Sequence, residues 1–136
     1  HGALYNQAAK DSALAAGVAR AVARFSRSLI LVGLAGSVLL EAGQEAGLLT
    51  WAEGFVDRAY NPDGSLRSRK LPGALLETPA EAAAQALRIA ISGIEITSGG
   101  ETTHLKVDTL CLHGDGPHAL EFAKAVKEKL TTDKPR

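Results

Sequence analysis

The sequence predicts an α/β fold with mostly parallel strands and flanking helices. Two observations support this prediction. Helical patterns alternate with short apolar runs along the 136 residues, which is the order of βαβ units. The run 29–32 is continuously apolar, as expected of a parallel strand that is covered on both faces. The main strands are too few to close a barrel and would leave open edges, so we expect residues 1–136 to be the carboxyl-terminal portion of a single larger α/β domain.

The first half of the chain contains two predicted helices and two predicted strands. Asp11, Ser12 and Ser37 are residues that cap helix N-termini, and the glycines at 33 and 36 suit a turn. The predicted elements are, in order, a helix from Asp11 or Ser12 to about Arg27, a strand over 29–32, a turn over 33–36, a helix from Ser37 to about Gly47, and a strand over 48–56.

The second half begins with a long segment that has no strong period and contains the tight-turn residues 61–64. Thr78-Pro79-Ala80-Glu81 is a capping box with Pro at the first helical position, and Gly93 is a stop signal. The predicted elements are a loop over 57–76, a helix from Pro79 to Ser92, two short strands around Gly99-Gly100 within 94–107, a strand that begins at Asp108, and a last helix over 117–130.

The composition excludes several classes of protein. Lys and Arg number 15, as do Asp and Glu, which argues against a nucleic acid or an anionic membrane as partner. The single Cys rules out an internal disulfide and suits a reducing compartment, so we expect a cytoplasmic location. The longest uncharged run, 28–40, is too short to span a bilayer. The chain begins at His1 and lacks Met, so we expect it not to be a complete translation product.

The stretch Asp108–Asp115 is the most informative part of the sequence. Its last residues place an imidazole, His113, and a carboxylate, Asp115, at the carboxyl end of a strand, where α/β folds place their chemistry. The alternative is that His113 is a hydrogen-bonded residue at the rim and that Asp115 only satisfies the start of the following helix. Cys111 and His113 share a strand face about 7 Å apart, whereas a nucleophile needs its base within roughly 3 Å. We therefore favour a small buried thiol for Cys111.

A second candidate group closes the strand over 48–56. Glu53 and Asp57 share a face with two aromatic side chains, so their pKa values could separate and divide acid and base roles. Arg58 could grip a carboxylate or a phosphate in bidentate fashion. The alternative is an ion pair at a strand end.

The loop over 57–72 is long for a compact domain and is predicted as a lid, with a solvated excursion as the alternative. Its donors and positive charges, which suit an anionic ligand, are Tyr60, Arg67, Arg69 and Lys70. The sequence contains neither a P-loop nor a dinucleotide fingerprint, and no His or Cys spacing forms a self-contained metal site. His104 and His118 are predicted surface residues.

Three stretches together resemble the LamB/YcsF family of lactam-utilisation proteins. They agree with the family in order and spacing, and a turn at 71–74 falls where the family has a similar one. The stretches are His1-Gly2-Ala3-Leu4-Tyr5-Asn6, the run from Glu53 to Gly64, and Asp108 to Asp115. The likeness extends from the first residue to about Leu130.

The resemblance implies a fold and an activity. The fold is a distorted βα barrel of the glycoside hydrolase/deacetylase superfamily type, whose amino-terminal half is absent from residues 1–136. The activity is that of an ATP-dependent 5-oxoprolinase, which hydrolyses the lactam of 5-oxo-L-proline to L-glutamate together with two partner subunits. The cofactors are ATP and, as an open alternative, a divalent metal ion.

The resemblance also implies a set of site residues, which we expect to converge on one cavity. The expected catalytic residues are His1, Glu53, Asp57, His113 and Asp115. The expected substrate-binding residues are Tyr5, Asn6, Arg58 and Tyr60. Candidate metal ligands are His1, His113 and Asp115. Two alternatives stay open: a metal-dependent deacetylase or amidohydrolase that needs no ATP, and a non-catalytic substrate-binding subunit.

Overall fold

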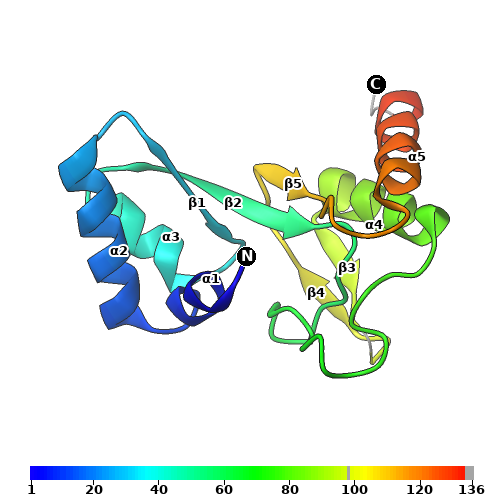
Figure 1. Ribbon diagram of the computed structural model, residues 1–136, viewed down its shortest axis with the longest axis horizontal. Coiled ribbons are helices and arrows are strands. Elements are labelled where there is room, and N and C mark those ends of the chain that lie inside the picture. Colours follow the sequence, from blue (N-terminus) through cyan, green and yellow to red (C-terminus); the bar gives the residue numbers. More distant parts are fainter. Residues whose placement is uncertain (98, 134–136) are drawn as a thin grey trace. The chain divides into compact units, whose positions relative to one another are not determined.

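A computed structural model of the chain describes residues 1–97 and 99–133 (Figure 1). Its contacts divide the chain into two compact units, His1–Glu53 and Gly54–Arg136. The elements are α1 (Ala3–Ala8), α2 (Ser12–Phe25), β1 (Ile30–Leu34), α3 (Val38–Glu45), β2 (Leu49–Phe55), α4 (Pro79–Ser92), β3 (Ile94–Ile96), β4 (Thr102–His104), β5 (Thr109–Cys111) and α5 (Ala119–Thr132). The order of helices and strands from α2 onward is the predicted one.

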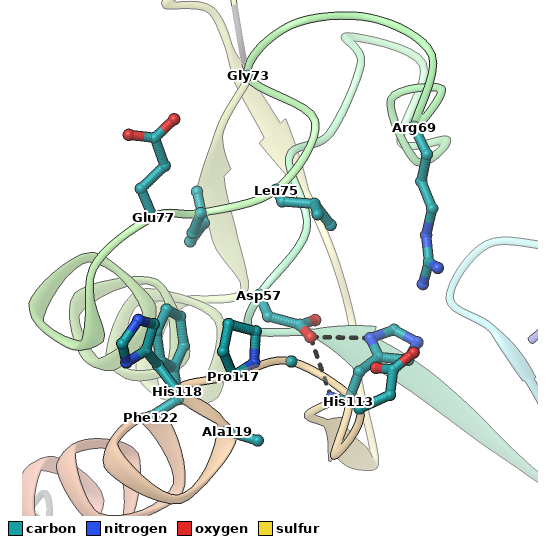
Figure 2. Close-up of a pocket in the computed structure, with 13 residues that line it drawn as sticks. Asp57, Arg69, Gly73, Leu75, Glu77, His113, Pro117, His118, Ala119 and Phe122 are labelled. Atoms are coloured by element: carbon teal, nitrogen blue, oxygen red, sulfur yellow. Dashed lines mark hydrogen bonds and ion pairs between the residues drawn. The ribbon is translucent and has the colours of Figure 1, made fainter.

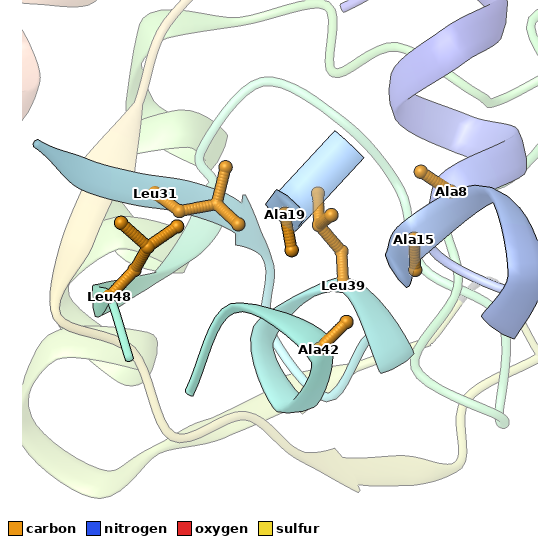
Figure 3. Packing of buried hydrophobic residues seen from close by; sticks show 7 residues of the cluster. All are labelled: Ala8, Ala15, Ala19, Leu31, Leu39, Ala42 and Leu48. Atoms are coloured by element: carbon orange, nitrogen blue, oxygen red, sulfur yellow. The ribbon is translucent and has the colours of Figure 1, made fainter. Parts of the chain in front are cut away.

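The first unit is a parallel strand pair with helices packed on it. β1 and β2 pair in parallel, from Ile30 opposite Leu49 to Leu34 opposite Glu53. α2 and α3 pack on each other and bury a small core (Figure 3). Its buried members are Ala8, Ala15, Ala19, Leu31, Leu39, Ala42 and Leu48. Because most of these side chains are short, the helices can approach the strands closely.

The other face of this strand pair corrects one prediction. The run 29–32 was expected to be covered on both faces, but Ile30 and Val32 are 38% and 37% exposed. Their cross-strand partners Leu49 and Trp51 are 69% and 46% exposed. The helices of the first unit pack on the face of Leu31, and no described element of that unit covers the opposite one.

Two helix starts of the first unit also differ from expectation. α1 was not predicted, because its six residues follow Gly2, which offers no capping side chain. Ser37 precedes α3 as predicted, but its side chain makes no capping bond. Its Oγ is buried and finds no hydrogen-bond partner among residues 1–97 and 99–133. Ser37 is therefore a buried packing residue, and its backbone conformation rather than its hydroxyl begins the helix.

The second unit is organised around α4. Thr78 and Glu81 form the predicted capping box, and Gly93 ends the helix in the left-handed conformation, with φ of 61°. The bond from the Thr78 hydroxyl lowers the pKa of Glu81. α4 packs on α5, and β3 pairs antiparallel with β4, as predicted for the segment around Gly99-Gly100. The Val56 N–H donates to the Cys111 carbonyl oxygen at 3.0 Å, which joins the end of β2 to β5.

The predicted last strand is shorter than expected. β5 ends at Cys111, so His113 and Asp115 lie in the connection to α5 rather than on the strand itself. The physical reason is that the His113 N–H donates to Asp57 Oδ2 at 3.0 Å instead of to a strand. α5 likewise begins at Ala119, two residues later than expected, with His118 as a cap residue that makes no side-chain capping bond.

The segment 57–77 is folded at its base rather than being a solvated excursion. The Ala59 N–H donates to the Ala74 carbonyl oxygen, and the Leu76 N–H donates to that of Asp57, both at 3.0 Å. Gln85 of α4 is buried and donates through Nε2 to the carbonyl oxygens of Phe55 and Arg58, at 2.7 and 2.8 Å. These bonds hold the backbone on both sides of Asp57.

No described helix combines the length and the apolar character that crossing a bilayer would require.

Candidate active site

An aspartate and a histidine form the central pair of the second unit (Figure 2). Asp57 follows β2 and His113 follows β5. Asp57 Oδ2 accepts the His113 N–H at 3.0 Å and lies 2.8 Å from His113 Nδ1. Phe55 stacks on the imidazole, with ring centroids 5.5 Å apart and an angle of 20° between the planes. The position of the imidazole is therefore set by three contacts: the hydrogen bond of the His113 N–H, the contact of Nδ1 with Asp57, and the stacking on Phe55.

The contact with Asp57 bears on which nitrogen of the imidazole carries the proton. An ionised carboxylate only accepts hydrogen bonds, so an ionised Asp57 would hold the proton on Nδ1 and leave the lone pair of the ring on Nε2. The side chains of His113 and Asp57 are 17% and 13% exposed. The second oxygen, Asp57 Oδ1, is buried and accepts no hydrogen bond from the described residues. Together the pair has the arrangement of a general base with an orienting carboxylate.

The pair lies at a cavity of about 570 Å³ within the second unit. Asp57, His113 and Asp115, all predicted as catalytic, line it together, and Figure 2 shows ten of the lining residues labelled. The complete lining is Asp57, Arg69, Gly73, Leu75, Leu76, Glu77, His113, Asp115, Gly116, Pro117, His118, Ala119 and Phe122. The cavity is large enough for a small metabolite.

Two predicted substrate-binding residues do not line this cavity. Arg58 is 5% exposed, and its Nη2 donates to the Arg67 carbonyl oxygen at 2.8 Å. Burial lowers the pKa of Arg58, and the neighbouring Arg69 lowers it further. Tyr60 is fully buried, and its hydroxyl accepts the Phe55 N–H at 2.7 Å. Both side chains hold the loop in place, and their role in substrate binding stays a prediction without support from their positions.

A second cluster of predicted residues lies in the first unit. Glu53, 9% exposed, accepts the Tyr5 hydroxyl at 2.8 Å through Oε2, which also lies 2.9 Å from His1 Nε2. The His1 and Tyr5 rings meet edge to face at 4.7 Å. α1, which was not predicted, carries Tyr5 to this carboxylate. The fourth predicted residue, Asn6, is exposed and donates to the Gly2 carbonyl oxygen at 2.9 Å, so it supports its own helix.

The second unit also brings two potential metal ligands together. The sulfur of Cys111 and a ring nitrogen of His113 lie within 4.8 Å of each other. A buried thiol was predicted for Cys111, whereas the side chain is partly exposed. Two ligand atoms do not define a metal site, so a divalent ion stays a prediction.

Comparison with known proteins identifies the family of the chain. The LamB/YcsF family matches residues 1–135. A 5-oxoprolinase subunit of Methylococcus capsulatus is 54% identical over 130 residues, which are 96% of this chain and 50% of that protein. The corresponding protein of Tolumonas auensis is 52% identical over 130 residues, 96% of this chain and 52% of that protein. The chain thus spans about half the length of the curated relatives it matches.

A solved structure supports the same assignment. The chain resembles the lactam utilization protein of Thermus thermophilus with a TM-score of 0.87 and 41% sequence identity, over 96% of this chain and 52% of that one. The predicted α/β fold class is confirmed, and the likeness is consistent with a βα-barrel-like fold. From the family match and these relatives, the chain belongs to the LamB/YcsF family.

Proposed function

We propose that this chain carries the general base of a 5-oxoprolinase, which hydrolyses the lactam of 5-oxo-L-proline to L-glutamate. The observation that supports the proposal most directly is the Asp57–His113 pair at the cavity of the second unit. Relatives that share about half of its residues are named as 5-oxoprolinase subunits.

The chemistry follows from the pair. A lactam is a resonance-stabilised amide, so its carbonyl carbon accepts water only if the water is deprotonated and the carbonyl oxygen is activated. In the proposal, His113 Nε2 takes a proton from the attacking water while Asp57 stabilises the imidazolium that forms. When the ring C–N bond breaks, the same proton passes from His113 to the departing nitrogen. Asp115, which also lines the cavity, is a second candidate for this transfer.

The proposal includes ATP and two partner subunits. ATP would supply the activation of the carbonyl oxygen that an isolated imidazole cannot provide. Since the sequence has no P-loop and no dinucleotide fingerprint, we do not assign the nucleotide to residues of this chain. The residues that we assign are those that handle the proton.

The test is a chimeric protein in which this chain replaces the 130 matching residues of the Methylococcus capsulatus relative, assembled with that organism's partner subunits. Replacing His113 by Ala should lower ATP-dependent turnover of 5-oxo-L-proline at least roughly 100-fold, because a general base contributes about that much or more. The melting temperature should stay nearly unchanged. His113→Gln, which keeps a donor for Asp57, serves as a second variant if Ala loosens the segment.

The matched control is His104→Ala, on β4, whose side chain is exposed and lies outside the cavity. It should turn over substrate like the parent. Turnover by the His113 variants at the level of this control would remove His113 from the reaction. Turnover that persists without ATP would instead indicate an ATP-independent amidohydrolase.

A further inference from the structure

We propose that Arg69 binds the carboxylate of the substrate in the cavity of the second unit and thereby selects an anionic lactam. The inference rests on the proposed function and names a binding residue for it. The sequence pattern pointed to Arg58 for this task, but its buried guanidinium does not line the cavity.

The charges of the cavity require a cation for an anionic ligand. The carboxylates of Asp57, Glu77 and Asp115 line it, and they would repel a bound carboxylate. Arg69 is the only Lys or Arg among the described lining residues. A guanidinium can bind a carboxylate through two parallel hydrogen bonds, which fixes the orientation of the ligand as well as its charge.

The guanidinium of Arg69 is available for such a contact. It is exposed and forms no hydrogen bond or ion pair with residues 1–97 or 99–133. The two neighbouring arginines are engaged: Arg58 donates to the Arg67 carbonyl oxygen, and Arg67 donates through Nε to that of Pro72 at 3.0 Å. These bonds serve the fold of the loop, so Arg69 is the one of the three that can meet a ligand.

The loop presents Arg69 from a closed turn. The bond from Arg67 to Pro72 closes the segment around it, and the Leu71 N–H donates to the Ser68 carbonyl oxygen at 2.9 Å. Gly73 follows with φ of 69°, a left-handed conformation that favours glycine. In Figure 2 the Arg69 side chain extends from this loop in the direction of His113. A ligand held at Arg69 by its carboxylate would therefore present its other end to the Asp57–His113 pair.

The experiment compares two lactams and two substitutions in the chimeric protein assembled with its partners. The lactams are 5-oxo-L-proline and 2-pyrrolidone, which has the same ring without the carboxylate. The substitutions are Arg69→Gln and the control Lys70→Gln, which removes the adjacent positive charge from a side chain outside the cavity. Binding of each lactam is measured by calorimetry, so the result does not depend on turnover.

Arg69→Gln should weaken binding of 5-oxo-L-proline roughly 10- to 100-fold, the range lost with a charge-assisted hydrogen bond. Binding of 2-pyrrolidone should change less than about twofold, and Arg69→Lys should restore part of the loss. In turnover, KM should rise while kcat stays within about threefold.

Equal binding of 5-oxo-L-proline by Arg69→Gln and the parent would overturn the inference, and so would an equal loss in Lys70→Gln. The parent's failure to bind this lactam would also overturn it. If Arg69 behaves as expected but His113→Ala still turns over substrate, the assignment of His113 fails and that of Arg69 stands.

Discussion

At the scale of single residues, Asp57 contacts two nitrogen atoms of His113, one in the backbone and one in the ring. Asp57 Oδ2 accepts the backbone N–H of His113 and also contacts its Nδ1. The backbone contact fixes where His113 lies, and the ring contact with an ionised Asp57 favours the tautomer with its proton on Nδ1. The same oxygen, Asp57 Oδ2, thus contacts both the backbone and the ring of His113. Loss of the negative charge of Asp57 should affect the protonation of the imidazole more than the position of His113.

Asp57→Asn tests this separation. An amide that still accepts the backbone N–H keeps the segment in place but no longer stabilises an imidazolium, so kcat for 5-oxo-L-proline should fall roughly 10²- to 10⁴-fold. KM should change little, because the substitution removes charge rather than shape. Steady-state kinetics of the chimeric complex measure both. The control is Asp63→Asn, in the turn at 61–64 outside the cavity; a comparable loss of kcat there would contradict the role of Asp57.

The same scale shows what residue patterns can and cannot predict. Residue types at strand ends identified Asp57, His113 and Asp115, which line one cavity. Residue types did not show that Arg58 is buried whereas Arg69 lines the cavity. Arg58 is held by the Arg67 carbonyl oxygen and by Gln85 of α4, and these contacts form only when the loop folds. That loop has no period from which the direction of a side chain can be predicted. The signal for Arg69 was only its positive charge in a loop beside the site.

At the scale of elements, two glycines in helices have opposite roles. A Cβ on Gly43 of α3 would lie 2.6 Å from Thr50 Cγ2 and 2.9 Å from Leu31 Cδ2. The absence of a side chain is thus what lets α3 approach both strands of the first unit. A Cβ on Gly17 of α2 would meet nothing within 4 Å. Gly17 therefore lowers helix stability without serving a close contact.

The two glycines, Gly17 and Gly43, give a prediction in which one substitution is the control for the other. Gly17→Ala should raise the free energy of unfolding by up to about 1 kcal/mol, the difference in helix propensity. Gly43→Ala has the same propensity gain but introduces a clash, so it should lower the free energy of unfolding by about 1–3 kcal/mol. Urea unfolding of both variants measures the difference. Stabilisation by both substitutions would contradict the close packing of α3.

Elements were predicted well where local signals decide them. The capping box and the left-handed glycine at the two ends of α4 can each be predicted from residues close together in the sequence, and both appear in the structure. β5 was predicted too long because a carboxylate 56 residues away captures the His113 N–H. α1 was missed because it has no capping side chain. The end of β5 is thus set by a contact with a distant residue, which leaves no local pattern.

At the scale of the whole molecule, each unit contains its own group of predicted site residues. The first unit holds Glu53 with His1 and Tyr5, and the second holds Asp57 with His113 and the cavity. The chain spans about half the length of the relatives it matches. The resemblance of three separated motifs identified the family, whereas the alternation of helical patterns and apolar runs predicted the α/β fold class.

The most direct test of the central claim is chemical rescue of the His113→Ala variant by imidazole. The substitution leaves space for an imidazole beside Phe55 and Asp57, the two side chains that hold the ring. We predict that ATP-dependent turnover of 5-oxo-L-proline by the chimeric complex is lost and that added imidazole restores part of it, with no effect on the parent. Undiminished turnover by the variant without imidazole would contradict the assignment of His113 as the general base.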